Sequence, residues 1–373
     1  MYWRVTMKKI SYLELGSLII IELVTMLAGI NMTILKNGAG VNSWLSAIIA
    51  YILGFIPILF IIYIASYKPN LPLNEKINTL FGNKLGFVIN ILFSIILLFI
   101  GITILYNINN FILSQLLNRT PFIINYILLI ALVIYNANKG ITTISRTSLI
   151  LLCLNLFLFF INIFALIRHI DITNFFPLLK EDTNNILKTS LNIASIKTLP
   201  LLTILTIPKN RITNTQKYNK TIIISYIIST IISLLLVFVT FGTLGINLIK
   251  TFVYPEYIVL RKIKLLGFLE RIENIVSLQW IIGSFIYLTI IVYTISKSIP
   301  TKSLKSHKYI NLIIGILLIT LTMLIFKNNT IYDNYIIKIF PYIVSSISII
   351  YILLLIKIYF SKKTNTNSKN TNS

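Results

Sequence analysis

The chain has 373 residues, of which 56% are hydrophobic and only 12% are charged, and its mean hydropathy is +0.87. These values exclude a water-soluble globular protein and favour one that crosses a lipid bilayer many times. The formal net charge of +23 does not indicate a nucleic-acid partner, because the cations lie in short loops between apolar runs and no basic run alternates with stacking aromatic residues.

Apolar runs bounded by charged or turn residues predict about ten membrane-spanning helices within a single domain, residues 1–360. The expected spans are 10–35, 41–66, 86–117, 121–138, 144–167, 189–208, 221–246, 274–297, 309–326 and 335–358. The low-complexity tail, residues 361–373, is expected to be polar and disordered. Because most lysines and arginines fall on the side of the N-terminus, we expect both termini in the cytoplasm.

The sixth predicted span, SLNIASIKTLPLLTILTIP (residues 190–208), carries a lysine and a proline near its middle. Lys197 is too deep for its amine to reach either membrane surface, and a cation there costs on the order of 3 kcal/mol unless it is paired or solvated. Pro200 lacks a backbone donor and breaks the helix. Such a break is tolerated in a bilayer only where it faces protein or a water-filled cavity.

Ten spans divide into five plus five, and an odd number per half inverts the second half relative to the first. This is the arrangement of inverted-repeat transporters, in which the first helix of each half is broken near the substrate site. Span one contains Gly29 in the sequence TMLAGINM, at a position that matches Pro200 in span six. We therefore expect an all-α polytopic membrane protein with broken helices 1 and 6.

Glu22 lies in span one at a depth similar to that of Lys197. Two alternatives are open: the two charges pair directly, or each is satisfied separately by backbone groups or solvent. Lys197 could also serve as a built-in cation that holds a substrate carboxylate in place of a transported sodium ion.

Small and polar residues near the two breaks, together with residues of spans three and eight, form the predicted ligand site. The set is Glu22, Thr25, Ala28, Gly29, Tyr106, Asn107, Asn110, Ser195, Lys197, Thr198, Pro200, Gly283 and Tyr287. In span three, the polar residues share one helical face. Hydrogen bonding between helices explains that face equally well.

The connection between spans seven and eight contains EYIVLRKIKLL, an amphipathic pattern that predicts a helix lying on the outer membrane surface or over the site. The predicted lid or gating residues are Glu256, Arg261, Glu270 and Arg271. An alternative is that the acids near the start of span eight only complement its helix dipole.

Sequence patterns of catalysis are missing: we find no nucleophile elbow, no phosphate-binding glycine loop and no acid or histidine cluster with metal-ligand spacing. Cys153 is the single cysteine, so a disulfide framework is excluded. We therefore expect no enzyme activity, no cofactor and no metal.

Several segments resemble one protein family over about residues 9–360. The most specific is VYPEYIVLRKIKLLGFLERIENIVSLQW (253–280), and the others are ISYLELG (10–16), GVNSWLS (40–46), LFGNKLG (80–86), NRTPFII (118–124) and NFFPLL (174–179). The chain resembles the endospore germination permeases, the B subunits of spore nutrient germinant receptors, in the amino acid, polyamine and organocation transporter superfamily. It departs from that family in span one, which has one glycine at the break and no proline.

The resemblance implies a fold of the leucine-transporter type in the spore inner membrane. It also implies a small nutrient ligand, usually an amino acid, and A-type and C-type (lipoprotein) partner subunits. A proton-coupled amino acid transporter is the alternative function.

Overall fold

The computed structural model describes residues 9–179, 181–261, 273–301 and 304–370. Within these ranges the regular elements are helices, apart from an isolated bridge between Ile10 and Ile212. Nine helical segments of this described part are long and apolar enough to cross a membrane. The predicted all-helical polytopic architecture is confirmed.

The first half of the chain supplies five spans. Span one consists of α1 (Tyr12–Thr25), a π-helical turn (Leu27–Asn31) and α2 (Met32–Gly38). The other four are α3 (Ser43–Leu53) with α4 (Phe55–Ser66), then α5 (Leu73–Phe111), α6 (Phe122–Lys139) and α7 (Ile141–Leu166).

The second half begins with α8 (Thr183–Thr198), which continues as a 3-10 helix (Leu199–Thr206). The following helices are α9 (Tyr218–Thr251), α10 (Pro255–Arg261), α11 (Glu273–Ser298), α12 (Leu304–Ile325), α13 (Asn329–Lys338), α14 (Phe340–Ser345) and α15 (Ile347–Asn370). The predicted sixth span is not among the nine long helices, because α8 stops after 16 residues.

Both predicted breaks are present. Span one starts at a capping box, in which Ser11 and Glu14 satisfy each other's backbone N–H groups at 3.1 and 2.7 Å. It is interrupted at Gly29, whose φ of 72° lies in the left-handed region that favours glycine. Span six is interrupted where Pro200 enters the first turn of the 3-10 helix.

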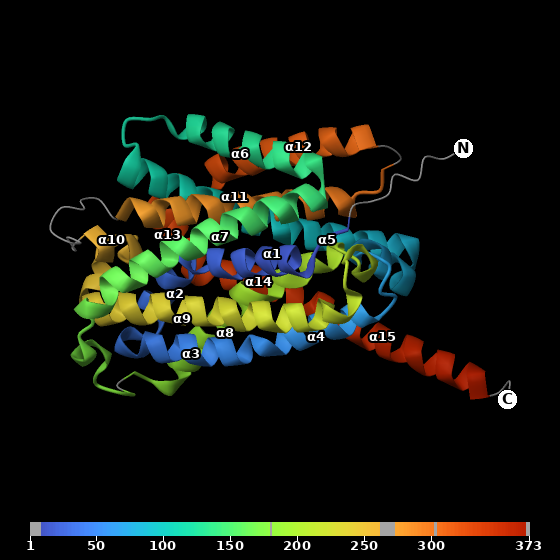
Figure 1. The fold of residues 1–373 in the computed structure, drawn as a ribbon, viewed down its shortest axis with the longest axis horizontal. Coiled ribbons are helices and arrows are strands. Elements are labelled where there is room, and N and C mark those ends of the chain that lie inside the picture. The colour runs from blue at the N-terminus through green and yellow to red at the C-terminus, as the bar shows by residue number, and fades with distance from the viewer. Residues whose placement is uncertain (1–8, 180, 262–272, 302–303, 371–373) are drawn as a thin grey trace.

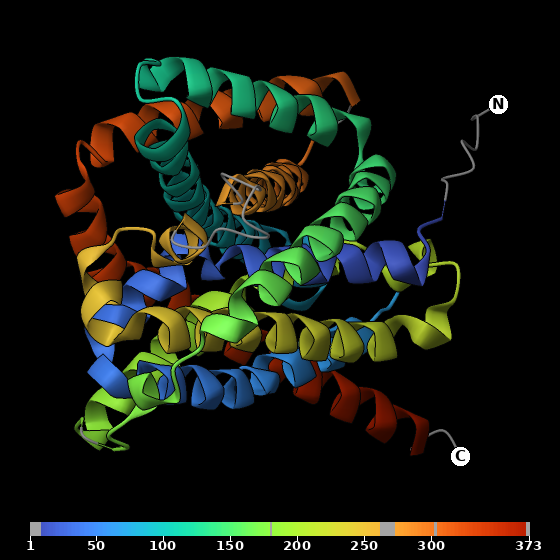
Figure 2. The same ribbon diagram turned by 60° about the vertical axis from the view of Figure 1, so that its left-hand side comes forward.

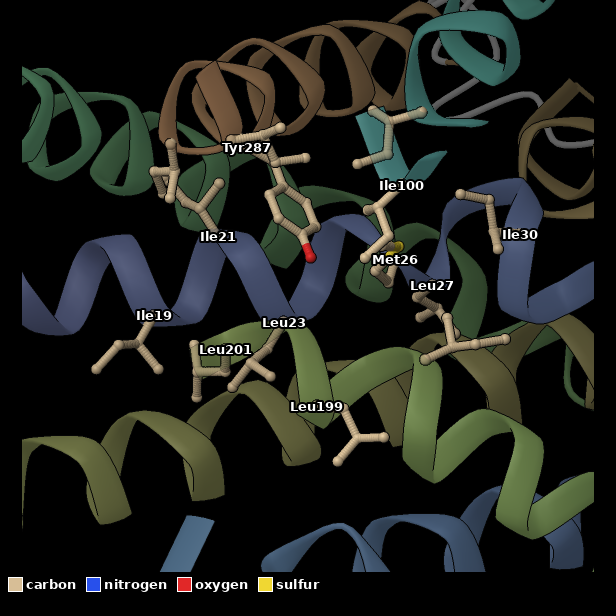
Figure 3. Packing of buried hydrophobic residues seen from close by; sticks show 14 of the residues in the cluster. Ile19, Ile21, Leu23, Met26, Leu27, Ile30, Ile100, Leu199, Leu201 and Tyr287 are labelled. Carbon is tan, nitrogen blue, oxygen red and sulfur yellow. The ribbon is translucent and has the colours of Figure 1, made fainter. Parts of the chain in front are cut away.

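The first span occupies the centre of the bundle. α1 packs against α7, α9 and α11, and 88% of the most apolar stretch of span one (Tyr12–Gly38) is buried, against 28% for the span that contains α12 (Lys305–Ile325). Figure 1 shows α1 among these neighbours, while α12 lies beside α6 at one edge in Figures 1 and 2. Figure 3 shows the apolar side chains of α1 and of the broken sixth span packed around the two breaks.

Two expected boundaries differ from the structure. α5 begins at Leu73 and not at 86, because an amphipathic segment precedes a kink at Gly82 (φ 79°, ψ 170°) and is joined to the span. The tail expected to be disordered from 361 is helical as far as Asn370. Its sequence SKKTNTNSKN contains no glycine or proline that would stop α15.

The kink at Gly82 generates a test of backbone strain. A Cβ at Gly82 would meet no atom within 4 Å, so a Gly82→Ala protein suffers only from the unfavourable φ and ψ. We expect it to lose about 1–3 kcal/mol of stability. Thermal unfolding in detergent measures the loss, with Asn83→Ala at the next, exposed helical position as the control. Equal melting temperatures for the two variants would contradict a strained kink.

Candidate functional site

A cavity lies beside the break in span one, between α1, α5, α7, α9, α10 and α11, and contains about 1070 Å³ of space between atoms. Most of its lining is aliphatic or aromatic. The polar lining residues are Thr25, Asn107, Asn155, Asn162, Thr240, Glu256, Gln279 and Ser284. Among the described residues that line it, Glu256 carries the only charge. A lining of this composition suits a small, mainly apolar molecule.

The break in span one is held by side chains from other parts of the fold. The N–H of Gly29 donates to Oε1 of Glu256 at 3.3 Å, and its carbonyl accepts from Oγ1 of Thr33 at 2.7 Å. A Cβ at Gly29 would lie 2.6 Å from Oδ1 of Asn107, so both the backbone angle and the close neighbour require glycine. Glu256 thereby connects the lid helix α10 to the broken helix.

Glu256 is buried although it lies in the connection between the spans of α9 and α11. Its side chain is 7% exposed, and its Oε2 atom has no hydrogen-bond partner. Burial raises the pKa of Glu256 to about 7, opposed by hydrogen bonds from its own backbone and from Gly29 and by the positive charge of Lys36.

Three amides form a network across the cavity wall between α7 and α11. The amide of Asn162 donates to Oε1 of Gln279 at 2.8 Å, and Nε2 of Gln279 donates to the carbonyl of Asn155 at 2.9 Å. The sequence prediction missed these residues. The spacing of Asn155 and Asn162, seven residues apart on one face of α7, could have indicated them. Asparagines are so frequent in this chain that the spacing does not stand out.

Lys197 and Glu22 do not pair in the structure: each has its own partners, as in the second alternative, although Oε2 of Glu22 has none among the described residues. The amine of Lys197 donates to Oγ of Ser233 at 3.0 Å and lies 3.8 Å from the ring centroid of Tyr51. Oε1 of Glu22 accepts from Oγ1 of Thr203 at 2.7 Å. The lysine faces α3 and α9, whereas the glutamate faces the 3-10 helix.

The predicted residues around the sixth-span break do not line the cavity: Lys197, Thr198 and Pro200 are buried elsewhere, and Ser195 is half-buried. Thr198 donates to the carbonyl of Ala194 at 2.6 Å, and the Leu199 carbonyl, next to the Pro200 break, accepts from the hydroxyl of Tyr351 at 3.2 Å. Tyr287 points from α11 toward α1 in Figure 3. Lys197 also lies outside the lining.

The other predicted residues have varied positions. Thr25, Asn107, Gly283 and Glu256 line the cavity, and Gly29 contacts it through Glu256.

Tyr106 instead donates to Asn329 at 3.1 Å, and the amide of Asn110 donates to Tyr254 at 2.7 Å. Ser195 donates to the carbonyl of Asn192 on its own helix at 2.8 Å.

Ala28 lies within the π-helical turn, and Arg261 is exposed at the end of α10. Glu270 and Arg271 lie outside the described residues.

Comparison with known families decides the class of protein. The model of the family described as "Spore germination protein" matches residues 9–331. The chain belongs to this family. It is 24% identical over 259 residues to spore germination protein KB of Bacillus subtilis (strain 168), covering 68% of this chain and 69% of that protein. It is 26% identical over 297 residues to spore germination protein XB of Bacillus anthracis, covering 78% and 80%.

This member of the spore germination family shares its fold with a transporter of known structure. A Na⁺-coupled sialic acid symporter, in a substrate-bound outward-open state, superimposes with a TM-score of 0.66 over 96% of this chain and 80% of that one, at 12% identity. This likeness confirms the expected leucine-transporter-like fold. Together with the membrane-length helices, it identifies an integral membrane protein.

Glu256 generates a prediction about pH. The unfolded chain loses this proton near pH 4.5 and the folded chain near 7, so ionisation lowers the free energy of unfolding as pH rises through this window. We expect Glu256→Gln to stabilise the ligand-free protein by on the order of 1–2 kcal/mol at pH 8, and to have little effect at pH 4.5. Melting temperatures at both pH values measure this, with exposed Glu75→Gln as the control. A gain confined to low pH would be the opposite of the expected result.

The separate environments of Lys197 and Glu22 predict the outcome of two double-mutant cycles. Lys197→Met with Tyr51→Leu should be non-additive by about 0.5–2 kcal/mol, because both remove one cation–π contact. Lys197→Met with Glu22→Gln should add to within about 0.5 kcal/mol, because the two share no partner. Thermal unfolding of the three single and the two double variants, compared with the unaltered protein, measures both couplings. If Lys197 coupled more strongly to Glu22 than to Tyr51, the result would contradict the separate environments and support a direct ion pair.

Proposed function

We propose that this chain is the membrane-embedded B subunit of a spore germination receptor, and that it binds a small nutrient, most simply an amino acid. The observation that carries the proposal is the cavity beside the broken first span, in a chain of the spore germination family. The cavity is mainly apolar, with a few convergent polar groups, as is typical of sites for small molecules.

The contact between Glu256 and Gly29 supports a route by which binding becomes a signal. It joins α10 to the break in span one by a hydrogen bond of 3.3 Å, and Glu256 lines the cavity. A ligand that binds one arrangement of this joint better than another shifts the population toward that arrangement. In the proposed receptor, A-type and C-type (lipoprotein) subunits read this shift in the spore inner membrane.

The proposed orientation places both termini in the cytoplasm. The chain begins α1 and ends α15 at the same end of the bundle in Figure 1. The surplus of lysines and arginines on this side supports a cytoplasmic assignment.

A proton-coupled amino acid transporter is the second candidate function. The fold similarity to a symporter favours it, as does Glu22, a buried acid on the broken span whose Oε2 atom has no hydrogen-bond partner. A buried acid of this kind is a suitable proton carrier. The two functions differ in whether the ligand crosses the membrane.

Liposomes separate these functions. We expect the purified protein to be stabilised by amino acids but to accumulate none in liposomes under an imposed proton gradient. Sustained accumulation above protein-free liposomes would favour the transporter.

A cavity-filling variant tests the location of binding. Leu156→Trp should abolish stabilisation by the ligand, because Leu156 lines the cavity. Leu154→Trp on the same helix should retain it, because Leu154 is 40% exposed on the outer surface. Equal binding by both variants would exclude this cavity as the site.

A further inference from the structure

Glu256 leaves one carboxylate oxygen without a partner at the cavity. The side chain is more than nine-tenths buried and lines the cavity; Oε1 accepts from the N–H of Gly29, but Oε2 accepts from no donor among the residues that the structure describes. A buried carboxylate oxygen without a donor carries a desolvation cost that a ligand donor can remove.

The lysine whose charge acts on this carboxylate binds another group. Lys36, whose charge acts on Glu256, donates its amine to the carbonyl of Phe252 at 2.8 Å. The described lining residues include no lysine, arginine or histidine. The cavity therefore favours a ligand that brings a positive charge and disfavours one with excess negative charge.

The rest of the lining is suited to hydrocarbon. Aliphatic and aromatic side chains cover most of it, and those of α1, α5, α7, α9 and α11 include Val24, Ile104, Leu152, Phe159, Leu236 and Trp280. Such a wall stabilises an apolar side chain that is removed from water but offers nothing to a charged side chain. The polar and apolar parts of the cavity therefore require different ends of one ligand.

We propose that the ligand's primary ammonium group donates to Oε2 of Glu256 while its uncharged hydrocarbon side chain lies against this apolar wall. The ligand class is an apolar amino acid or the corresponding amine. The proposal rests on the proposed function, because it names the ligand of the same cavity. It makes Glu256 a binding residue as well as the link between α10 and the break.

A set of related probes separates the chemical groups. L-leucine, L-valine and L-phenylalanine carry the ammonium group and an apolar side chain. Isopentylamine is leucine without its carboxylate, 4-methylpentanoate is leucine without its ammonium, and L-glutamate has a charged side chain.

Affinities are measured by calorimetry on the purified full-length protein at pH 8. We expect the apolar amino acids and isopentylamine to bind, and 4-methylpentanoate and L-glutamate to bind at least tenfold more weakly than leucine. Preference for leucine over isopentylamine would identify the amino acid as the ligand; the reverse would identify the amine.

A matched pair of variants tests the role of Glu256 itself. Glu256→Gln should weaken leucine and isopentylamine binding at least tenfold, whereas exposed Glu75→Gln should leave both affinities unchanged. The melting temperature of each variant shows whether it is folded. Unaltered affinity in Glu256→Gln, or 4-methylpentanoate binding as tightly as leucine, would overturn this inference and leave the proposed function standing. If none of the probes bound, both this inference and the proposed function would fail.

Discussion

The constraint on which this structure depends is that a helix broken inside a bilayer must find hydrogen-bond partners within the protein. At the first break, Glu256 of the lid helix accepts from Gly29, and Thr33 donates back to the same residue. At the second, Tyr351 of the last helix donates to Leu199. Each break is thus completed by a residue more than one hundred positions away, or by a neighbouring turn, and neither can form before the bundle has assembled around it. The broken helices and the tertiary fold are therefore one cooperative unit.

The same constraint explains why the polar groups of the bundle fall into two sets. One set borders the cavity and includes the amide network of Asn155, Asn162 and Gln279. The other surrounds the sixth-span break and is closed by bonds within the protein, such as Glu22 with Thr203. A cavity beside a break combines accessible space with backbone that is already irregular. A molecule in the proposed site would touch Glu256, and through it the hydrogen bond that joins α10 to the first break.

Much of the fold was predictable because its signals are local. Proline lacks an N–H wherever it stands, and a glycine within an apolar span marks a position that a side chain would disturb, so Pro200 and Gly29 identified both breaks from sequence. The partners of Lys197 and Glu22 were not predictable, because successive residues of a helix turn by about 100° and depth alone does not fix direction. The amide network was not predicted for a related reason: its members lie on α7 and α11, which are far apart in the sequence and meet only in the folded protein.

Lys197 has a consequence for how the molecule can move. Its amine is held jointly by Ser233 and the ring of Tyr51, with no carboxylate as a partner. Any sliding of α8 against α3 or α9 would leave a bare cation in a low-dielectric interior, at a cost on the order of 3 kcal/mol or more. The contacts of Lys197 therefore hold α3, α8 and α9 in a fixed arrangement. On the other side of the first break, by contrast, α10 and the segment before it are joined to span one by the hydrogen bonds from Gly29 to Glu256 and from Lys36 to the carbonyl of Phe252.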